Sequence, residues 1–195
     1  MALFIVVRGR VGAGKTSLAK GLVGALGFTR IDYDAAMMQS YVAYEGGSGL
    51  EAVRDLSRHD GRTSVGLEAA SHISAGRSVV VDADLRDAAE LSDIINAAQL
   101  GPGGPRLLVI RLEVARKVAQ ARMMTDAWEE FRTLGASQAS RIFSALWSYP
   151  LSPVPGERTI PTDARSADEV LDAVCAIIRE VGWDRPTTTP GGPLR

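Results

Sequence analysis

The feature that most constrains this chain is a glycine-rich bend that joins an apolar run to a helical pattern. Residues 9–16 read GRVGAGKT, which fits the spacing G-x-x-x-x-G-K-[ST]. The apolar residues 3–7 before the bend predict a buried strand, and Leu18, Leu22 and Leu26 after it lie on one helical face. Strand, bend and helix therefore follow one another in the order that a phosphate-binding loop requires.

The residue types of this bend suit the binding of a nucleoside triphosphate. Glycines let backbone N–H groups curl around a polyphosphate, and the N-terminus of the next helix adds partial positive charge. Lys15 would reach the β- and γ-phosphates, and the hydroxyl of Thr16 would ligate Mg²⁺. The dinucleotide pattern G-x-G-x-x-G is not matched, because position 17 holds a serine. The predicted nucleotide-binding residues of the bend are Gly9, Arg10, Val11, Gly12, Ala13, Gly14, Lys15, Thr16 and Ser17.

The composition is that of an ordinary single globular domain. The chain has 195 residues, of which 46% are hydrophobic and 23% charged, and its net charge is −1. This balance argues against an extended nucleic acid or an anionic membrane as a partner. Cys175 is the only cysteine, so no intrachain disulfide is expected. No apolar run has transmembrane length and the N-terminus lacks the layout of a signal peptide, so the expected location is the cytoplasm.

Strand and helix patterns alternate along the rest of the chain. Further strand patterns occupy residues 29–32, 78–82, 106–112 and 158–160. The clearest helix begins after a capping box formed by Ser166 and Glu169 and ends at Gly182. Such alternation implies a parallel sheet that helices cover on both faces. We expect one domain over residues 1–182 and a flexible tail over residues 183–195.

Two pairs of carboxylates follow predicted strands. Asp32 and Asp34 end the second strand, and Asp82 and Asp84 end the third. Function collects at the carboxyl ends of an open parallel sheet. Phosphate transfer to a hydroxyl needs Mg²⁺, positive charge around the phosphate, and a carboxylate that deprotonates the acceptor. Two other interpretations stay open, because Asp34 could cap the helix expected over residues 35–44 and Asp82 could be an ordinary turn residue.

Taken together, four stretches of the chain resemble the P-loop small-molecule kinases. They are GRVGAGKTSLAKGL, RIDYDAAM, GRSVVVDADLRDAAEL and LLVIRLEVARKVAQARMMTD. The group includes shikimate and gluconate kinases, adenylylsulfate kinase, chloramphenicol phosphotransferase, zeta toxins and the kinase domain of polynucleotide kinase. The resemblance covers residues 1–181. It implies an α/β P-loop NTPase fold, a three-layer sandwich whose five-stranded, mostly parallel sheet has the order 2-3-1-4-5. It also implies ATP and Mg²⁺ as cofactors and a small-molecule hydroxyl as the acceptor.

The resemblance assigns roles to individual residues. IDYD is similar to the D-x-D of shikimate kinase, which gives Asp32 a metal role beside Thr16 and makes Asp34 the acceptor-side base. The apolar run before Asp82 resembles that of a Walker B carboxylate, which acts on Mg²⁺ directly or through water. Arg122 fits the lid arginine, so the implied catalytic residues are Lys15, Asp34 and Arg122. The loop over residues 159–165, with Thr162, would pack against the nucleotide base.

Two longer segments are expected to act around the acceptor. Residues 46–62 contain glycines and few apolar residues, which suits a mobile substrate cover. Residues 116–148 would form the lid and the helices that follow it.

The chain departs from the family pattern at two places. Many relatives carry an arginine three residues after the base carboxylate, where this chain has Met37. With Met38, Tyr41 and Tyr44 nearby, this favours an uncharged or partly apolar acceptor, since a buried anion without a positive partner is costly. The second arginine of the lid pattern R-x-x-x-R is replaced by Asp126.

Two other arginines were considered as the missing lid partner. Arg116 lies six residues before Arg122, about 120° around a straight helix, so the two cannot share a face. Arg132 would serve only if the chain bends near residue 126.

The sequence bears on three other function classes. A GTPase switch would need N-K-x-D, which is impossible because Asn96, the only asparagine, is followed by Ala97; we therefore expect adenine or weak base selectivity. A polynucleotide 5′-hydroxyl kinase is disfavoured by the neutral charge, although a short end could bind. A non-catalytic nucleotide-binding module would leave the acidic pairs without a use. The sequence leaves open whether the protein is a monomer or a homodimer.

Overall fold

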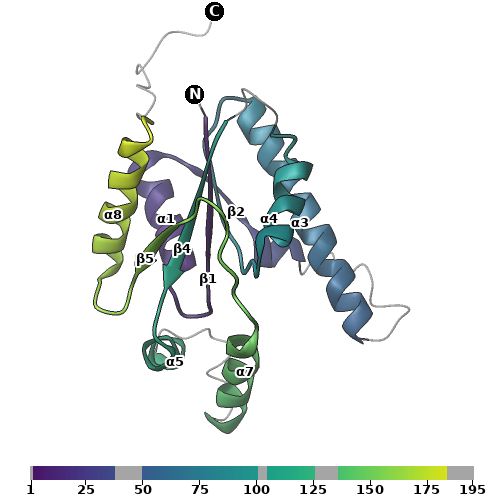
Figure 1. Ribbon diagram of the computed structural model, residues 1–195, viewed down its shortest axis with the longest axis vertical. Helices are drawn as coiled ribbons and strands as arrows, with labels where there is room; N and C mark the ends of the chain where they lie inside the picture. Colours follow the sequence, from purple (N-terminus) through teal and green to yellow (C-terminus); the bar gives the residue numbers. More distant parts are fainter. Residues whose placement is uncertain (1, 38–49, 101–104, 126–135, 184–195) are drawn as a thin grey trace, which may run out of the picture.

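A five-stranded parallel sheet lies at the centre of the structure, a computed structural model that describes residues 2–37, 50–100, 105–125 and 136–183 (Figure 1). Its strands are β1 (Leu3–Gly9), β2 (Thr29–Asp32), β3 (Val79–Asp82), β4 (Arg106–Glu113) and β5 (Arg158–Pro161). All neighbouring strands pair in parallel, in the order β2-β3-β1-β4-β5. The predicted fold class and strand order are therefore confirmed.

Helices cover both faces of this sheet and its carboxyl edge. They are α1 (Lys15–Leu26), α3 (Leu50–Ser74), α4 (Ala88–Ala97), α5 (Arg116–Thr125), α7 (Ala136–Ser148) and α8 (Ala167–Glu180). Successive side chains of a strand point to opposite faces, so Leu3, Ile5 and Val7 pack under α1 and α8, whereas Phe4 and Val6 pack under α3 and α4. Helices α5 and α7 lie below the ends of the strands (Figure 1).

The last helix forms as its sequence predicts. The Ser166 side chain accepts a hydrogen bond from the Glu169 backbone N–H, and the Glu169 carboxylate accepts one from the Ser166 N–H. This capping box satisfies two N–H groups that the first turn would leave unpaired. The apolar stripe that follows, with Val170, Val174 and Ile178, is buried against α1 and the sheet.

Most of the segment predicted to cover the substrate is helical. Residues 50–62 belong to α3, and residues 46–49 lie outside the described residues. The glycines of this region allow close packing rather than a loose loop. A Cβ atom on Gly66 would lie 2.5 Å from the Cβ atom of Ala97, and one on Gly61 would lie 3.0 Å from the Cα atom of Met37. Two neighbouring backbones therefore approach α3 at its glycines.

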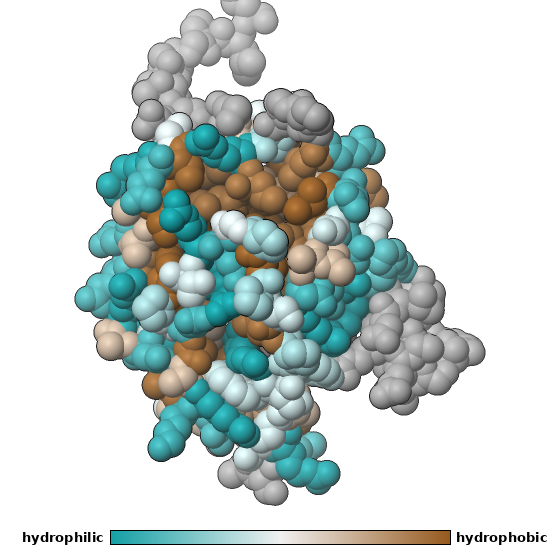
Figure 2. Space-filling view, in the orientation of Figure 1, coloured by the Kyte–Doolittle hydropathy of each residue, from teal (hydrophilic) through white to brown (hydrophobic). Residues whose placement is uncertain are grey.

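Polar and apolar residues separate along the strands. Figure 2 shows apolar residues over the upper half of the sheet, between α8 and α4, whereas the end near α5 and α7 is more polar. The polar end is the carboxyl edge, where the predicted site residues lie. None of the described helices is long and apolar enough to cross a membrane.

Candidate active site

The loop between β1 and α1 has the shape that anion binding needs. Gly12 and Gly14 have φ angles of +76° and +93°, in the left-handed region that favours glycine. A Cβ atom on Gly12 would also lie 2.7 Å from the carbonyl oxygen of Ala119, so the loop packs directly on α5. Gly14 begins α1 without a side-chain cap, and the first turn of this helix contains no acidic residue. The N–H groups of this turn are therefore positioned for phosphate oxygens.

Lys15 spans the inside of this loop. Its Nζ atom donates to the carbonyl oxygens of Gly9 and Arg10, at 2.7 and 3.2 Å. The Arg10 side chain turns the other way. It donates to the carbonyl oxygens of Trp147 and Tyr149 at the end of α7. Arg10 can therefore contribute its backbone, but not its charge, to a nucleotide in this arrangement.

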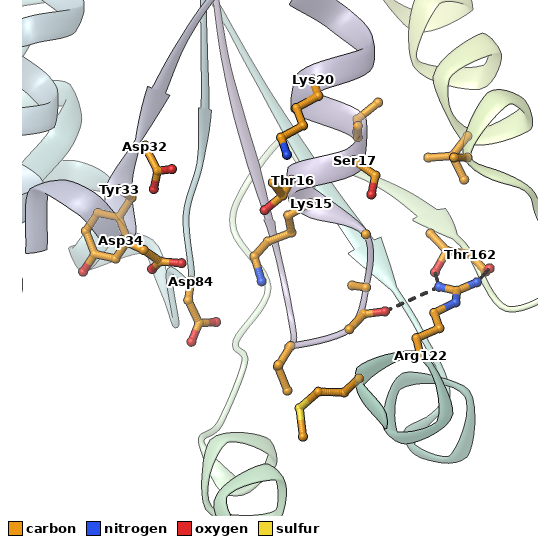
Figure 3. Close-up of a pocket in the computed structure, with 18 of the residues that line it drawn as sticks. Lys15, Thr16, Ser17, Lys20, Asp32, Tyr33, Asp34, Asp84, Arg122 and Thr162 are labelled. Carbon is orange, nitrogen blue, oxygen red and sulfur yellow. Dashed lines mark hydrogen bonds between the residues drawn. The ribbon is translucent and has the colours of Figure 1, made fainter. Parts of the chain in front are cut away.

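A pocket of about 1010 Å³ opens in front of the loop. Figure 3 shows Asp34 and Asp84 on one side of Lys15, and Arg122 and Thr162 on the other. The predicted residues that line it are Val11, Gly12, Ala13, Gly14, Lys15, Thr16, Ser17, Asp32, Asp34, Arg122 and Thr162. The structure thus brings the predicted phosphate, base and acceptor groups to one cavity, with Asp82 directly behind Thr16.

The metal corner, formed by Thr16, Asp32 and Asp82 at the edge of the pocket where the sequence predicts Mg²⁺, includes a residue that the sequence analysis missed, Arg30. Thr16 Oγ1 donates to Asp82 Oδ2 at 2.8 Å. Arg30 donates to both oxygens of the same carboxylate, from Nε to Oδ1 at 2.8 Å and from Nη2 to Oδ2 at 2.9 Å. Arg30 Nη2 also lies 2.9 Å from Asp32 Oδ2. This pairing depends on the register of β2 and β3, in which Asp32 stands beside Asp82.

The hydroxyl oxygen of Thr16 fits Mg²⁺, which prefers hydroxyl, carboxylate and water ligands. Thr16 would hold the cation, with Asp32 and Asp82 beside it. Within the described parts of the chain, no group of three or more His, Cys, Asp or Glu side chains could hold a metal. The phosphates of a nucleotide and water would therefore have to complete the coordination.

Asp34 lines the pocket on the same side of Lys15 as Asp84 (Figure 3). The alternative that Asp34 caps the following helix is wrong, because the helical residues begin at 33 and Asp32 Oδ1 accepts from the Ala35 N–H at 3.1 Å. The Asp34 side chain is solvent-accessible, but the pocket walls remove part of its hydration, which raises the pKa of the carboxyl. Lys15 lowers this pKa, whereas Asp32 and Asp84 raise it further. A carboxylate with a raised pKa is a better proton acceptor.

The arginines of α3 differ in whether they reach the acceptor side. Arg62 is nine-tenths buried and pairs with Asp93 at 2.8 Å and Glu90 at 3.4 Å, so α4 holds it away from the pocket. Burial of the Tyr33 side chain raises its pKa to about 12, although the neighbouring Arg62 acts in the opposite direction. Arg58 does line the pocket, with its guanidinium 5.5 Å from the centre of the Tyr149 ring.

Among the residues expected in the acceptor wall, Met37 lines the pocket as predicted. Met38, Tyr41 and Tyr44 lie outside the described residues.

Arg122 joins the lid helix to the loop predicted for the nucleotide base. It donates from Nη2 to the Thr162 carbonyl oxygen at 2.6 Å and from Nη1 to Thr162 Oγ1 at 3.2 Å. Arg116 instead contacts Ser144 of α7, as expected for the other side of the helix. Arg132 lies outside the described residues. Of the three arginines predicted as candidates for the lid, Arg122 is the one that the described residues place in the pocket.

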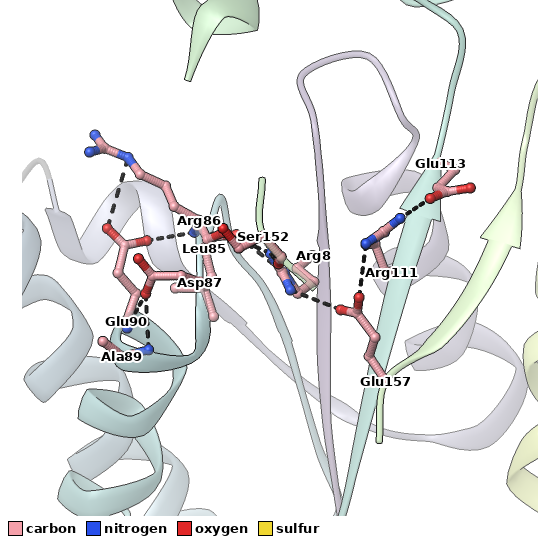
Figure 4. Close-up of polar contacts among 10 residues, drawn as sticks. All are labelled: Arg8, Leu85, Arg86, Asp87, Ala89, Glu90, Arg111, Glu113, Ser152 and Glu157. Atoms are coloured by element: carbon pink, nitrogen blue, oxygen red, sulfur yellow. Dashed lines mark hydrogen bonds and ion pairs between the residues drawn. The ribbon is translucent and has the colours of Figure 1, made fainter. Parts of the chain in front are cut away.

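A buried arginine on β1, Arg8, links the segments that lie next to this site. Arg8 on β1 has no solvent exposure, and it donates to the carbonyl oxygens of Leu85, Arg86 and Ser152 at 2.9 to 3.2 Å (Figure 4). Its Nη1 atom pairs with Glu157 at 2.8 Å, and Glu157 also pairs with Arg111 at 3.0 Å. The segment before β5 is thereby fixed to the centre of the sheet.

We expect Arg8→Met to lower the free energy of unfolding by about 3 kcal/mol, because three carbonyl groups lose their donor and Glu157 keeps a single ion-pair partner. Urea unfolding followed by circular dichroism measures the change. Arg106→Met, at an exposed position on β4, is the matched control and should change stability by less than about 0.5 kcal/mol. Equal stability of the two variants would contradict the structural role given to Arg8.

Comparisons with known proteins agree with this geometry. A family model described as an AAA domain matches residues 4–127. A sugar kinase from Janibacter sp. shares 18% identity at a TM-score of 0.67, over 92% of this chain and 95% of that one. A gluconokinase from Sinorhizobium meliloti shares 22% identity at a TM-score of 0.63, over 92% and 93% of the two chains.

A third solved structure, the APS kinase of Mycobacterium tuberculosis in complex with AMPPNP and APS, shares 16% identity at a TM-score of 0.64, over 91% and 98% of the two chains. At these identities the similarity shows a common fold. No curated protein sequence matches the chain.

Proposed function

Because the chain belongs to the AAA domain family of P-loop proteins, we propose that it is an ATP- and Mg²⁺-dependent kinase of a small-molecule hydroxyl. One observation carries the proposal. The same cavity contains the phosphate-binding loop and, across Lys15 from it, the carboxylate of Asp34 (Figure 3). A module that merely bound nucleotide would have no use for a carboxylate with a raised pKa at that place.

Asp34, Lys15 and Arg122 would each have a separate role in phosphate transfer. Asp34 would take the proton of the acceptor hydroxyl while the acceptor oxygen bonds to the γ-phosphorus and the bond to the leaving ADP oxygen breaks. Lys15 and the N–H groups of α1 would hold the phosphate oxygens in line for this exchange. Arg122 would add positive charge from the lid side. Mg²⁺, when bound beside Thr16, would neutralise charge on the phosphates.

The acceptor is proposed to be small and uncharged or partly apolar. Met37 occupies the wall next to Asp34, and Arg62 is committed to α4. The sugar kinase and the gluconokinase with the same fold are named for small hydroxylated substrates, which supports a small acceptor. Among the described side chains of α3, Arg58 is the arginine that lines the pocket and could still pair with an anionic acceptor.

A phosphate-transfer screen tests the proposal. Purified protein with Mg²⁺ and ATP is given matched neutral and anionic alcohols, and product formation is followed by mass spectrometry. We expect neutral alcohols to be phosphorylated, and Arg58→Met to change their kcat/KM by less than about threefold, because no charge has to be neutralised there. A 5′-hydroxyl oligonucleotide in the panel tests the alternative of a polynucleotide kinase.

Three results would contradict different parts of this proposal. Turnover confined to carboxylated or phosphorylated acceptors, and lost in Arg58→Met, would refute the uncharged acceptor while leaving the kinase intact. Turnover confined to the oligonucleotide would move the protein to the alternative class. Strong preference for GTP over ATP would refute the expected base selectivity.

A further inference from the structure

The carboxylates of Asp32 and Asp82 in the metal corner already form ion pairs with the side chain of Arg30. Both oxygens of Asp82 accept from Arg30, and Oδ2 accepts from Thr16 as well. Asp82 is nearly buried, with 5% of its side chain exposed, and Arg30 is 22% exposed. Paired nitrogens and oxygens at 2.8 and 2.9 Å form the strong two-pronged contact that arginine makes with carboxylates.

From this geometry, and resting on the proposed function, we propose that Arg30 is a positioning residue that prevents Asp82 and Asp32 from binding a divalent cation directly. It thereby reserves Asp82 for orienting the hydroxyl of Thr16. This hydroxyl has a single proton, and the proton is donated to Asp82. The lone pairs of Thr16 Oγ1 are thus left for the cation.

Charge explains why the cation would bind only together with a nucleotide. Asp32 and Asp82 carry two negative charges, and Arg30 cancels one of them at hydrogen-bond distance. The remaining attraction for a free cation is weak, and the bidentate contact leaves no oxygen of Asp82 without a donor. Phosphate oxygens would supply the missing negative charge, so metal and nucleotide would enter as a pair.

The proposal is tested by titrating nucleotide-free protein with Mn²⁺, the cation detected by electron paramagnetic resonance. We expect the wild type to bind Mn²⁺ weakly. The dissociation constant of Arg30→Met should be about tenfold or more lower, because the substitution removes a positive charge within about 4 Å of the carboxylates. Arg30→Lys retains the charge and should stay close to the wild type. Arg77→Met, on the surface between α3 and β3, is the matched control for loss of an arginine.

A double variant separates this role from a structural one. Arg30→Met combined with Asp82→Asn should lose the gained Mn²⁺ affinity, because the freed carboxylate is the ligand. If Arg30→Met does not fold, Arg30→Gln takes its place, with circular dichroism as the check. Unchanged Mn²⁺ affinity in a folded Arg30→Met or Arg30→Gln protein would overturn the proposal, as would a gain that Asp82→Asn does not remove. The titration needs neither acceptor nor turnover, so its failure is distinguishable from failure of the kinase function.

Discussion

Replacing Lys15 with alanine is expected to slow phosphate transfer by at least about a thousandfold, because its ammonium would supply positive charge where charge develops on the phosphates. The Nζ atom already lies inside the loop, held by the carbonyl oxygens of Gly9 and Arg10. Loss of these two hydrogen bonds should leave the fold intact, since β1 and α1 are built from buried apolar residues. An ADP-coupled assay measures the rate, and thermal unfolding measures the fold.

The chain provides its own control for this substitution. Lys20 lines the same pocket from the next turn of α1, but it makes no contact with the loop carbonyls that hold Lys15. Lys20→Ala removes the same charge from the same helix, and we expect it to slow the reaction less than about tenfold. Normal turnover by a folded Lys15→Ala protein would show that the loop does not bind the triphosphate in the proposed way.

Asp34→Asn is expected to lower kcat between about a hundredfold and ten-thousandfold, because an amide cannot accept the proton of the acceptor hydroxyl. Nucleotide affinity should change less than about twofold, since Asp34 and the loop proposed to hold the phosphates lie on different sides of Lys15 (Figure 3). Stopped-flow or coupled kinetics give kcat, and calorimetry gives the nucleotide dissociation constant. The matched variant is Asp84→Asn, which removes a neighbouring carboxylate of the same pocket. A larger loss in Asp84→Asn than in Asp34→Asn would assign the base role to Asp84.

The raised pKa of Asp34 adds two tests with definite signs. The base form is required, so kcat/KM should fall as the pH drops through a pKa above the ordinary value of 3.8. The native state holds this proton more tightly than the unfolded chain does. The ionised carboxylate therefore destabilises the fold above its native pKa, and this cost disappears as the pH falls through that pKa. Asp34→Asn should consequently keep or raise the melting temperature at neutral pH.

How much could be predicted depended on how far apart in the chain the contacting residues lie. The phosphate loop was predictable because strand, glycines, lysine and helix are neighbours in sequence. The sheet order followed from the family resemblance. Arg30 sits in the same short stretch as Asp32, yet its pairing with Asp82 requires the register between two strands, which no local pattern contains.

The burial of Arg8 and the packing of α3 also could not be predicted, because both depend on residues that lie far away in the sequence. Arg8 looks like any arginine that precedes a glycine loop, and its burial follows from carbonyl oxygens that lie far away in sequence. Gly61 belongs to the segment whose glycines suggest a mobile cover, whereas it lies in α3 where the backbone of Met37 comes close. A glycine in a sequence indicates that a side chain is absent, but only the three-dimensional neighbours show whether the reason is movement or crowding.

The contacts of Arg8 and Arg10 also set an order for the maturation of the site. Two of the partners of Arg8 lie 144 and 149 residues later in the chain, and the two partners of Arg10 lie 137 and 139 residues later. A nascent chain that ends before these partners would bury Arg8 in the middle of the sheet without its ion pair, which is unfavourable. The contacts that hold the two ends of this arginine pair around the phosphate loop can therefore form only once residues 147–157 have been synthesised.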